Sequence, residues 1–95
     1  MTERVIQAQI LDYLRRRADV YVWRSSVGFR GGHRYGGPPG TPDIIGMFNG
    51  RFLGIEVKGP QGKLTPEQEA VRDSVISHGG LYVEARSVDD VANAL

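Results

Sequence analysis

The chain has 95 residues, of which 40% are hydrophobic and 24% charged, and it contains no cysteine. This composition indicates one small folded domain, residues 1–95, and it excludes disulfides, thiolate metal sites and extensive disorder. The net charge of +1 does not indicate a nucleic-acid partner by itself, so any such surface must come from local clusters of cations. The N-terminus lacks a signal-peptide pattern, and no apolar run reaches membrane-spanning length. We therefore expect a cytosolic protein without a membrane partner.

Residues 2–18 are expected to form an amphipathic helix. Its apolar residues recur at spacings of three and four, and residues 15–17, all arginine, crowd the last turn, where cations complement the helix dipole. Glu3 and Gln7 extend the apolar stripe toward the N-terminus. A carboxylate in this place either lies past the edge of the core or belongs to a site, and the pattern leaves both open.

Residues 20–27 are rich in β-branched and aromatic side chains and predict a strand. Residues 28–42 are the longest irregular segment, and their glycine content is typical of either a functional loop or a plain connector. Cations and aromatic side chains alternate there, which suits contact with phosphates and some stacking on bases. These residues are Phe29, Arg30, His33, Arg34 and Tyr35.

Asn49-Gly50 lies between two runs rich in Ile, Phe, Leu and Val, which predicts a β-hairpin closed by a type I′ turn. Opposed residues then have numbers that sum to 99, so Asp43 faces Glu56. Lys58 follows on the same side as Glu56, because side chains alternate along a strand. The other side supplies a core face, made of Ile44, Leu53, Ile55 and Val57.

Two carboxylates placed opposite each other destabilise a sheet unless something lies between them. A hard divalent cation is the natural candidate, since Mg²⁺ uses one or two carboxylates together with waters and phosphate oxygens. The alternative is that Asp43 caps the start of a strand while Glu56 and Lys58 form a solvated surface pair. The register favours the metal site.

Thr65-Pro66-Glu67-Gln68 predicts the start of a helix, with Thr65 as N-cap and Gln68 in the capping-box position. This helix should run to about Ser77 and end at the glycines that follow. Gln68 also shares a face with the apolar residues of the helix, so it can point toward whatever the helix packs on.

Residues 81–85 predict a further strand, and Ser87 begins a short terminal helix in which Asp90 is positioned to close a cap. The helix between the hairpin and this strand permits a crossover connection. We therefore expect an α/β fold in which helices pack on a mixed sheet.

The pattern Pro-Asp…Glu-x-Lys, formed by Pro42-Asp43 and Glu56-Val57-Lys58, resembles the PD-(D/E)xK nuclease superfamily. Further segments are similar to the stand-alone VRR-NUC domain and extend the resemblance over nearly the whole chain: Glu3…Ile6-Gln7, Gly40-Thr41-Pro42-Asp43, Glu56-Val57-Lys58-Gly59-Pro60 and Leu64-Thr65-Pro66-Glu67-Gln68. The resemblance implies a restriction-endonuclease-like core, with a central mixed β-sheet flanked by helices in the order α-β-β-β-α-β-α.

The resemblance also implies catalytic roles. Asp43 and Glu56 would bind Mg²⁺ or Mn²⁺, with the backbone carbonyl of Val57 as a further ligand. Lys58 would orient the attacking water and steady the charge on the phosphate. Such chemistry hydrolyses a phosphodiester without a covalent protein nucleophile.

Two more residues would assist through the helices: Glu3 at the metal, and Gln68 by orienting substrate or water. The resemblance implies a homodimer acting on branched DNA, with a four-way (Holliday) junction as first substrate and duplex or flapped ends as second. Candidate DNA contacts flank the site in sequence: Arg24, Arg30, His33, Arg34 and Lys63. A non-cleaving DNA-binding module and a structural protein without DNA affinity remain the alternatives.

Overall fold

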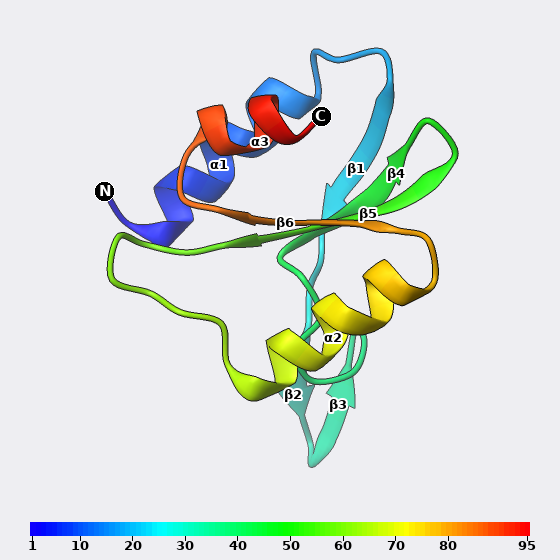
Figure 1. Cartoon of the computed structure of the whole chain (residues 1–95). Coiled ribbons are helices and arrows are strands. Elements are labelled where there is room, and N and C mark those ends of the chain that lie inside the picture. The colour runs from blue at the N-terminus through cyan, green and yellow to red at the C-terminus, as the bar shows by residue number, and fades with distance from the viewer.

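A four-stranded sheet lies between two helices on one face and one helix on the other (Figure 1). A computed structural model describes the backbone of residues 1–95 and every side chain except that of Phe29. The elements in chain order are α1 (Glu3–Leu14), β1 (Val20–Arg24), β2 (Gly28–Arg30), β3 (His33–Tyr35), β4 (Ile44–Phe48), β5 (Arg51–Val57), α2 (Pro66–Ser77), β6 (Leu81–Ala85) and α3 (Val88–Ala94).

The strand order in the sheet is β1-β4-β5-β6. β4 is antiparallel to both of its neighbours, whereas β5 and β6 are parallel. A parallel pair needs a crossover, and α2 supplies it. The predicted mixed sheet flanked by helices is thus confirmed.

The hairpin formed by β4 and β5 closes at Asn49 and Gly50, whose φ angles are 49° and 80°. Both are positive, as a type I′ turn requires. Phe48 pairs with Arg51, so the predicted register is confirmed. At Gly54 a Cβ atom would lie 2.9 Å from Cγ of Pro42. The missing side chain therefore lets Pro42 lie close against β5, which fixes the backbone just before Asp43.

The hydrophobic core lies on the face of the sheet that α1 and α3 cover (Figure 1). The predicted core face of the hairpin is confirmed, since its four side chains are all fully buried. The core cluster comprises Ile6, Ile10, Leu11, Leu14, Ile44, Leu53, Ile55, Val57, Val83, Ala85 and Val91.

Two element boundaries differ from the sequence-based expectation. Helix α1 ends at Leu14 instead of residue 18, because Arg17 turns back to bind the carboxylate of Asp19 and pack near Tyr13. Strand β1 ends at Arg24 instead of residue 27. The next residue, Ser25, donates its hydroxyl to the carbonyl of Pro42 at 2.6 Å.

The segment 28–42, expected to be irregular, contains a small antiparallel hairpin made of β2 and β3. The turn between them has two glycines, Gly31 and Gly32, with positive φ angles of 58° and 79°. The sequence did not predict these strands, because each has only three residues, too few to show an alternating pattern.

The cap of α3 differs from a standard capping box. The Asp90 carboxylate accepts the N–H of Arg86, one residue before the N-cap Ser87, instead of the N–H of Ser87 itself. No helix in the described chain is both long and apolar enough to cross a membrane.

Candidate active site

The hairpin register brings the two predicted metal-binding carboxylates together. Asp43 immediately precedes β4, and its Oδ2 accepts the backbone N–H of Val57 at 2.8 Å. Glu56 lies in β5 on the same side of the sheet, beside the Asp43 carboxyl. The two acids therefore emerge from one surface as neighbours.

Glu56 is buried to an unusual degree for a carboxylate, with 3% of its surface exposed. Its Oε2 lies 3.9 Å from Nζ of Lys58 and accepts a hydrogen bond from Nε2 of Gln68 at 3.2 Å. Its Oε1 is buried and receives no hydrogen bond from a donor among the described residues. Buried carboxylate oxygens normally have partners, so this atom marks a place where one belongs.

Burial, first of all, and then the negative charge of the adjacent Asp43 raise the pKa of Glu56 to about 8. Lys58 acts in the opposite direction, because its ammonium favours the ionised carboxylate. The site thus favours a proton on Glu56 unless another cation joins Lys58.

Gln68 has two roles in the structure. Its side-chain Oε1 accepts the N–H of Thr65 at 2.9 Å, which with the Thr65 hydroxyl completes the predicted capping box. Its Nε2 is then left to donate to Glu56. The cap of α2 therefore fixes the amide that holds Glu56 in place.

Glu3 reaches the same region from the first turn of α1. Its Oε2 accepts the backbone N–H of Gly59 at 3.3 Å. A Cβ placed on Gly62 would lie 3.4 Å from this oxygen and 3.3 Å from Cδ of Lys58. The turn after β5 therefore packs on both Glu3 and Lys58, which is 8% exposed.

Two residues near the site were not predicted. Arg86 donates to the carbonyl of Gly62 at 2.6 Å and pairs with Glu84 at 2.7 Å, so it holds the turn that packs on Lys58. Tyr82 lies on the site face beside Gly54, and its buried hydroxyl has no hydrogen-bond partner among the described residues. Neither was detectable without knowing that β6 lies parallel to β5.

The side chains predicted to contact DNA lie at the protein surface and not beside Asp43 and Glu56. Arg30, His33 and Arg34 belong to the exposed β2–β3 hairpin, which projects on the α2 side of the sheet (Figure 1). Lys63 is exposed just beyond the turn after β5. Arg24 pairs with Ile44, so the alternation places it on the core side, opposite to the face of the acidic pair.

No group of three or more His, Asp or Glu side chains with the geometry of a metal site occurs in the described part of the chain. A divalent cation would therefore rest on Asp43 and Glu56, with backbone, water or phosphate oxygens completing its shell. The residues fit such an ion, because the unpartnered Glu56 oxygen and the close pair of acids both call for positive charge.

Comparisons with known proteins point to one family of domains. The model of the VRR-NUC domain matches residues 33–89, a stretch that includes Asp43, Glu56, Lys58 and Gln68. No relative was found among the curated proteins compared with the chain.

A solved structure titled "VRR_NUC domain protein" is similar in fold, with a TM-score of 0.69 and 21% sequence identity over 98% of this chain and 84% of that one. The predicted order α-β-β-β-α-β-α is thereby confirmed for the four-stranded sheet and its helices, with the β2–β3 hairpin inserted after the first strand. Because the family model covers more than half of the sequence, the chain belongs to the VRR-NUC family of nuclease-type domains.

Proposed function

We propose that this protein is a metal-dependent, structure-selective DNA endonuclease that hydrolyses phosphodiester bonds. The observation that carries the proposal is the buried Glu56 carboxylate, with one unpartnered oxygen, held between Asp43 and Lys58. Burying an acid beside another acid costs stability. Such an arrangement is typical of a site built to bind a cation.

The cofactor proposed is Mg²⁺ or Mn²⁺, held by Asp43 and Glu56 with the backbone carbonyl of Val57 as the further ligand. When bound, such an ion supplies Lewis acidity, which activates water and offsets the charge that develops on the phosphate oxygens. Binding favours the ionised form of Glu56, so the proton that its raised pKa retains leaves the site.

The protein side chains then position and stabilise. The Val57 N–H fixes one Asp43 oxygen, and the Gln68 amide fixes one Glu56 oxygen, so both carboxylates keep one orientation. Lys58 keeps its ammonium beside Glu56 and directs positive charge toward an incoming phosphate, where it stabilises the transition state. Glu3, tied to Gly59, adds negative charge at the edge of the cation site.

As substrate we propose branched DNA, with a four-way junction first and duplex or flapped ends second. A second part of the proposal is a homodimer, since two sites related by a two-fold axis can cut two strands symmetrically. The proposed backbone contacts are the exposed basic side chains of Arg30, His33, Arg34 and Lys63, with Arg24 on the other side of the sheet. Sedimentation of the purified protein tests the dimer.

The test of the nuclease is incubation of labelled four-way junction, flap and duplex DNA with Mn²⁺. Wild type should cut, whereas Glu56→Ala and Lys58→Ala should lose essentially all activity with an unchanged circular dichroism spectrum. Asp89→Ala is the control, because Asp89 is an exposed carboxylate on α3, the helix that covers the opposite face of the sheet. Equal cutting by wild type and Glu56→Ala would refute the proposal.

A non-cleaving DNA-binding module is the second candidate. It would shift the junction in a gel with EDTA present but leave it intact in Mn²⁺. A structural protein would show no DNA affinity even at low salt, where phosphate contacts are strongest.

A further inference from the structure

Four large apolar side chains are exposed on the sheet face that carries the acidic pair. They are Tyr21, Trp23, Met47 and Phe52, with exposed fractions of 68%, 47%, 49% and 44%. We call them the aromatic ledge. Exposed apolar clusters on a small protein usually mark a binding surface.

The strand register makes the ledge continuous. Tyr21 pairs with Met47, and Met47 pairs with Phe52, so these three form a row across β1, β4 and β5. Trp23 lies beside Tyr21, with ring centroids 5.7 Å apart and ring planes tilted by 55°. The ledge therefore runs from the free edge of the sheet toward α2.

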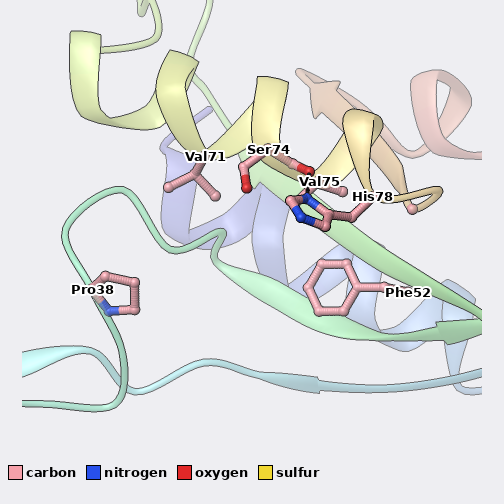
Figure 2. A pocket seen from close by; sticks show the side chains of 7 residues that line it. Pro38, Phe52, Val71, Ser74, Val75 and His78 are labelled. Atoms are coloured by element: carbon pink, nitrogen blue, oxygen red, sulfur yellow. Dashed lines mark hydrogen bonds between the residues drawn. The ribbon is translucent and has the colours of Figure 1, made fainter.

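At its α2 end the ledge opens into an apolar cavity of about 340 Å³. Figure 2 shows Phe52 on one side of this cavity, Val71 and Val75 of α2 on the other, and Pro38 at one end. The Phe52 ring is thus shared by the ledge and the cavity. A planar group lying on the ledge could extend into this space.

The ledge and the proposed cutting site lie on one surface. Trp23 pairs with Ile45, and Ile45 with Gly54, two residues before Glu56. With strands about 4.8 Å apart and a rise of about 3.4 Å per residue, Trp23 lies about 12 Å from Glu56 along the sheet. A few nucleotides of unpaired strand can span that distance.

We propose that the aromatic ledge is a stacking platform for unpaired bases of the DNA strand that is cut. Among the proposed substrates, the ledge then favours those with unpaired bases next to the cleavage point, such as a flapped end, over a fully paired duplex. This inference rests on the proposed nuclease function, whose acidic pair and Lys58 would receive the phosphate while the uncharged ledge receives the bases. Stacking on aromatic rings accepts every base, which suits recognition of structure and not of sequence.

Charge and position favour DNA bases over a second protein on this surface. The four ledge residues carry no charge, so they complement the uncharged bases of a strand whose phosphates run elsewhere. A protein packed on the ledge would cover the surface within about 12 Å of Glu56, where the substrate must enter. An occupant that shares the face with the scissile phosphate is the substrate itself.

The experiment uses Trp23 as a reporter, because it is the only tryptophan in the chain. The full-length protein is titrated with oligo(dT) in EDTA, so that no cutting occurs, while tryptophan fluorescence is recorded. We expect saturable quenching by oligo(dT) and by a splayed fork, with much weaker quenching by a blunt duplex.

Tyr21→Ala keeps the reporter and should weaken oligo(dT) binding by roughly 5- to 100-fold, whereas Tyr21→Phe, which retains the ring, should bind like wild type. Val5→Ala, at a 46% exposed position on α1, is the control and should leave binding unchanged. The loss in Tyr21→Ala should be similar at low and high salt, since stacking is not a phosphate contact.

Unchanged Trp23 emission on adding oligo(dT), or equal binding by Tyr21→Ala and wild type, would overturn the stacking platform. A Tyr21→Ala protein that loses a dimer yet binds DNA normally would identify the ledge as an interface between copies, and would also overturn it. Because the titration needs no metal, cutting without quenching refutes only the ledge, and quenching without cutting refutes only the nuclease.

Discussion

The two faces of the sheet show how one strand serves two purposes. On the face covered by α1 and α3, Leu53, Ile55 and Val57 of β5 are completely buried among apolar side chains. On the other face the same strand carries Phe52, which is exposed, and Glu56, which is a buried acid. Stability comes from one set of alternate positions, and the other set is free to carry chemistry that costs stability.

The helices on the two faces also differ in how deeply their side chains are buried. Helix α2 covers the site face, yet none of its side chains is fully buried, whereas α1 contributes four buried side chains to the core. The first turn of α2 is held by its capping box and by the contact of Gln68 with Glu56. Elements with few buried contacts open most easily, so the helix that holds Glu56 is also the one most readily displaced.

The largest expected effect compares neighbouring residues that point to opposite faces. Leu53→Ala should lower the free energy of unfolding by about 3 kcal/mol, because it leaves a cavity in a closed core. Phe52→Ala, at a 44% exposed position, should cost only about 1 kcal/mol. Urea denaturation of both variants measures the difference, and equal costs would mean that the site face is packed as tightly as the core.

The next effect is a dependence of the free energy of unfolding on pH, which arises from Glu56 on the site face. In the metal-free protein the pKa of Glu56 is raised to about 8 from 4.5, so the folded state keeps a proton that the unfolded state loses between these values. The contribution of Glu56 to stability is therefore fully present below about pH 4.5 and is lost as the pH rises through about 8, with on the order of 2 kcal/mol of the loss falling between about pH 6.5 and 8.

The variant Glu56→Gln cannot titrate at this position. Its stability should lack the fall seen in wild type, so in EDTA at pH 8 it should melt at a higher temperature than wild type. Glu84→Gln, at the paired position on β6, should keep the wild-type profile. A wild-type curve that rises from pH 5 to pH 8 relative to Glu56→Gln would contradict the assignment of a protonated Glu56.

A divalent cation should offset the loss of stability that wild type suffers when Glu56 ionises. At ten times its dissociation constant, Mg²⁺ or Mn²⁺ should stabilise the wild type by about 1.4 kcal/mol and release part of a proton near pH 7. Calorimetry in two buffers of different ionisation enthalpy measures the proton release. Glu56→Gln should lose both effects, whereas equal stabilisation of the variant would place the ion elsewhere.

The hairpin and its register were predictable because the turn residues Asn49-Gly50 and the alternating pattern are local signals. One turn then determines that Asp43 lies beside Glu56, so the centre of the site followed from sequence. The parallel pairing of β6 with β5 depends on a crossover that no short pattern encodes. The contacts of Arg86 and Tyr82 with the site were missed for that reason.

The contact of Gln68 with Glu56 was only half predictable. The capping-box pattern fixed the local role of Gln68, but its second hydrogen bond depends on how α2 lies over the sheet. Likewise, the face that Tyr21 and Trp23 occupy follows from pairing with β4. The exposure of these rings depends on which part of that face α2 leaves uncovered, and the local sequence does not determine this.

The smallest expected effect separates the two roles of Gln68. Thr65→Ala removes the hydroxyl that accepts the Gln68 N–H and should lower stability by about 1 kcal/mol. The Thr65 N–H still donates to the Gln68 side chain, so the amide stays directed at Glu56 and we expect cleavage to change little. Gln68→Ala should cost a similar amount of stability but reduce kcat much more, because Glu56 loses its only amide donor among the described residues. Thermal melts and single-turnover cleavage of both variants give the comparison. Equal losses of kcat would mean that Gln68 acts only through the helix cap, and that the site tolerates a freely turning Glu56.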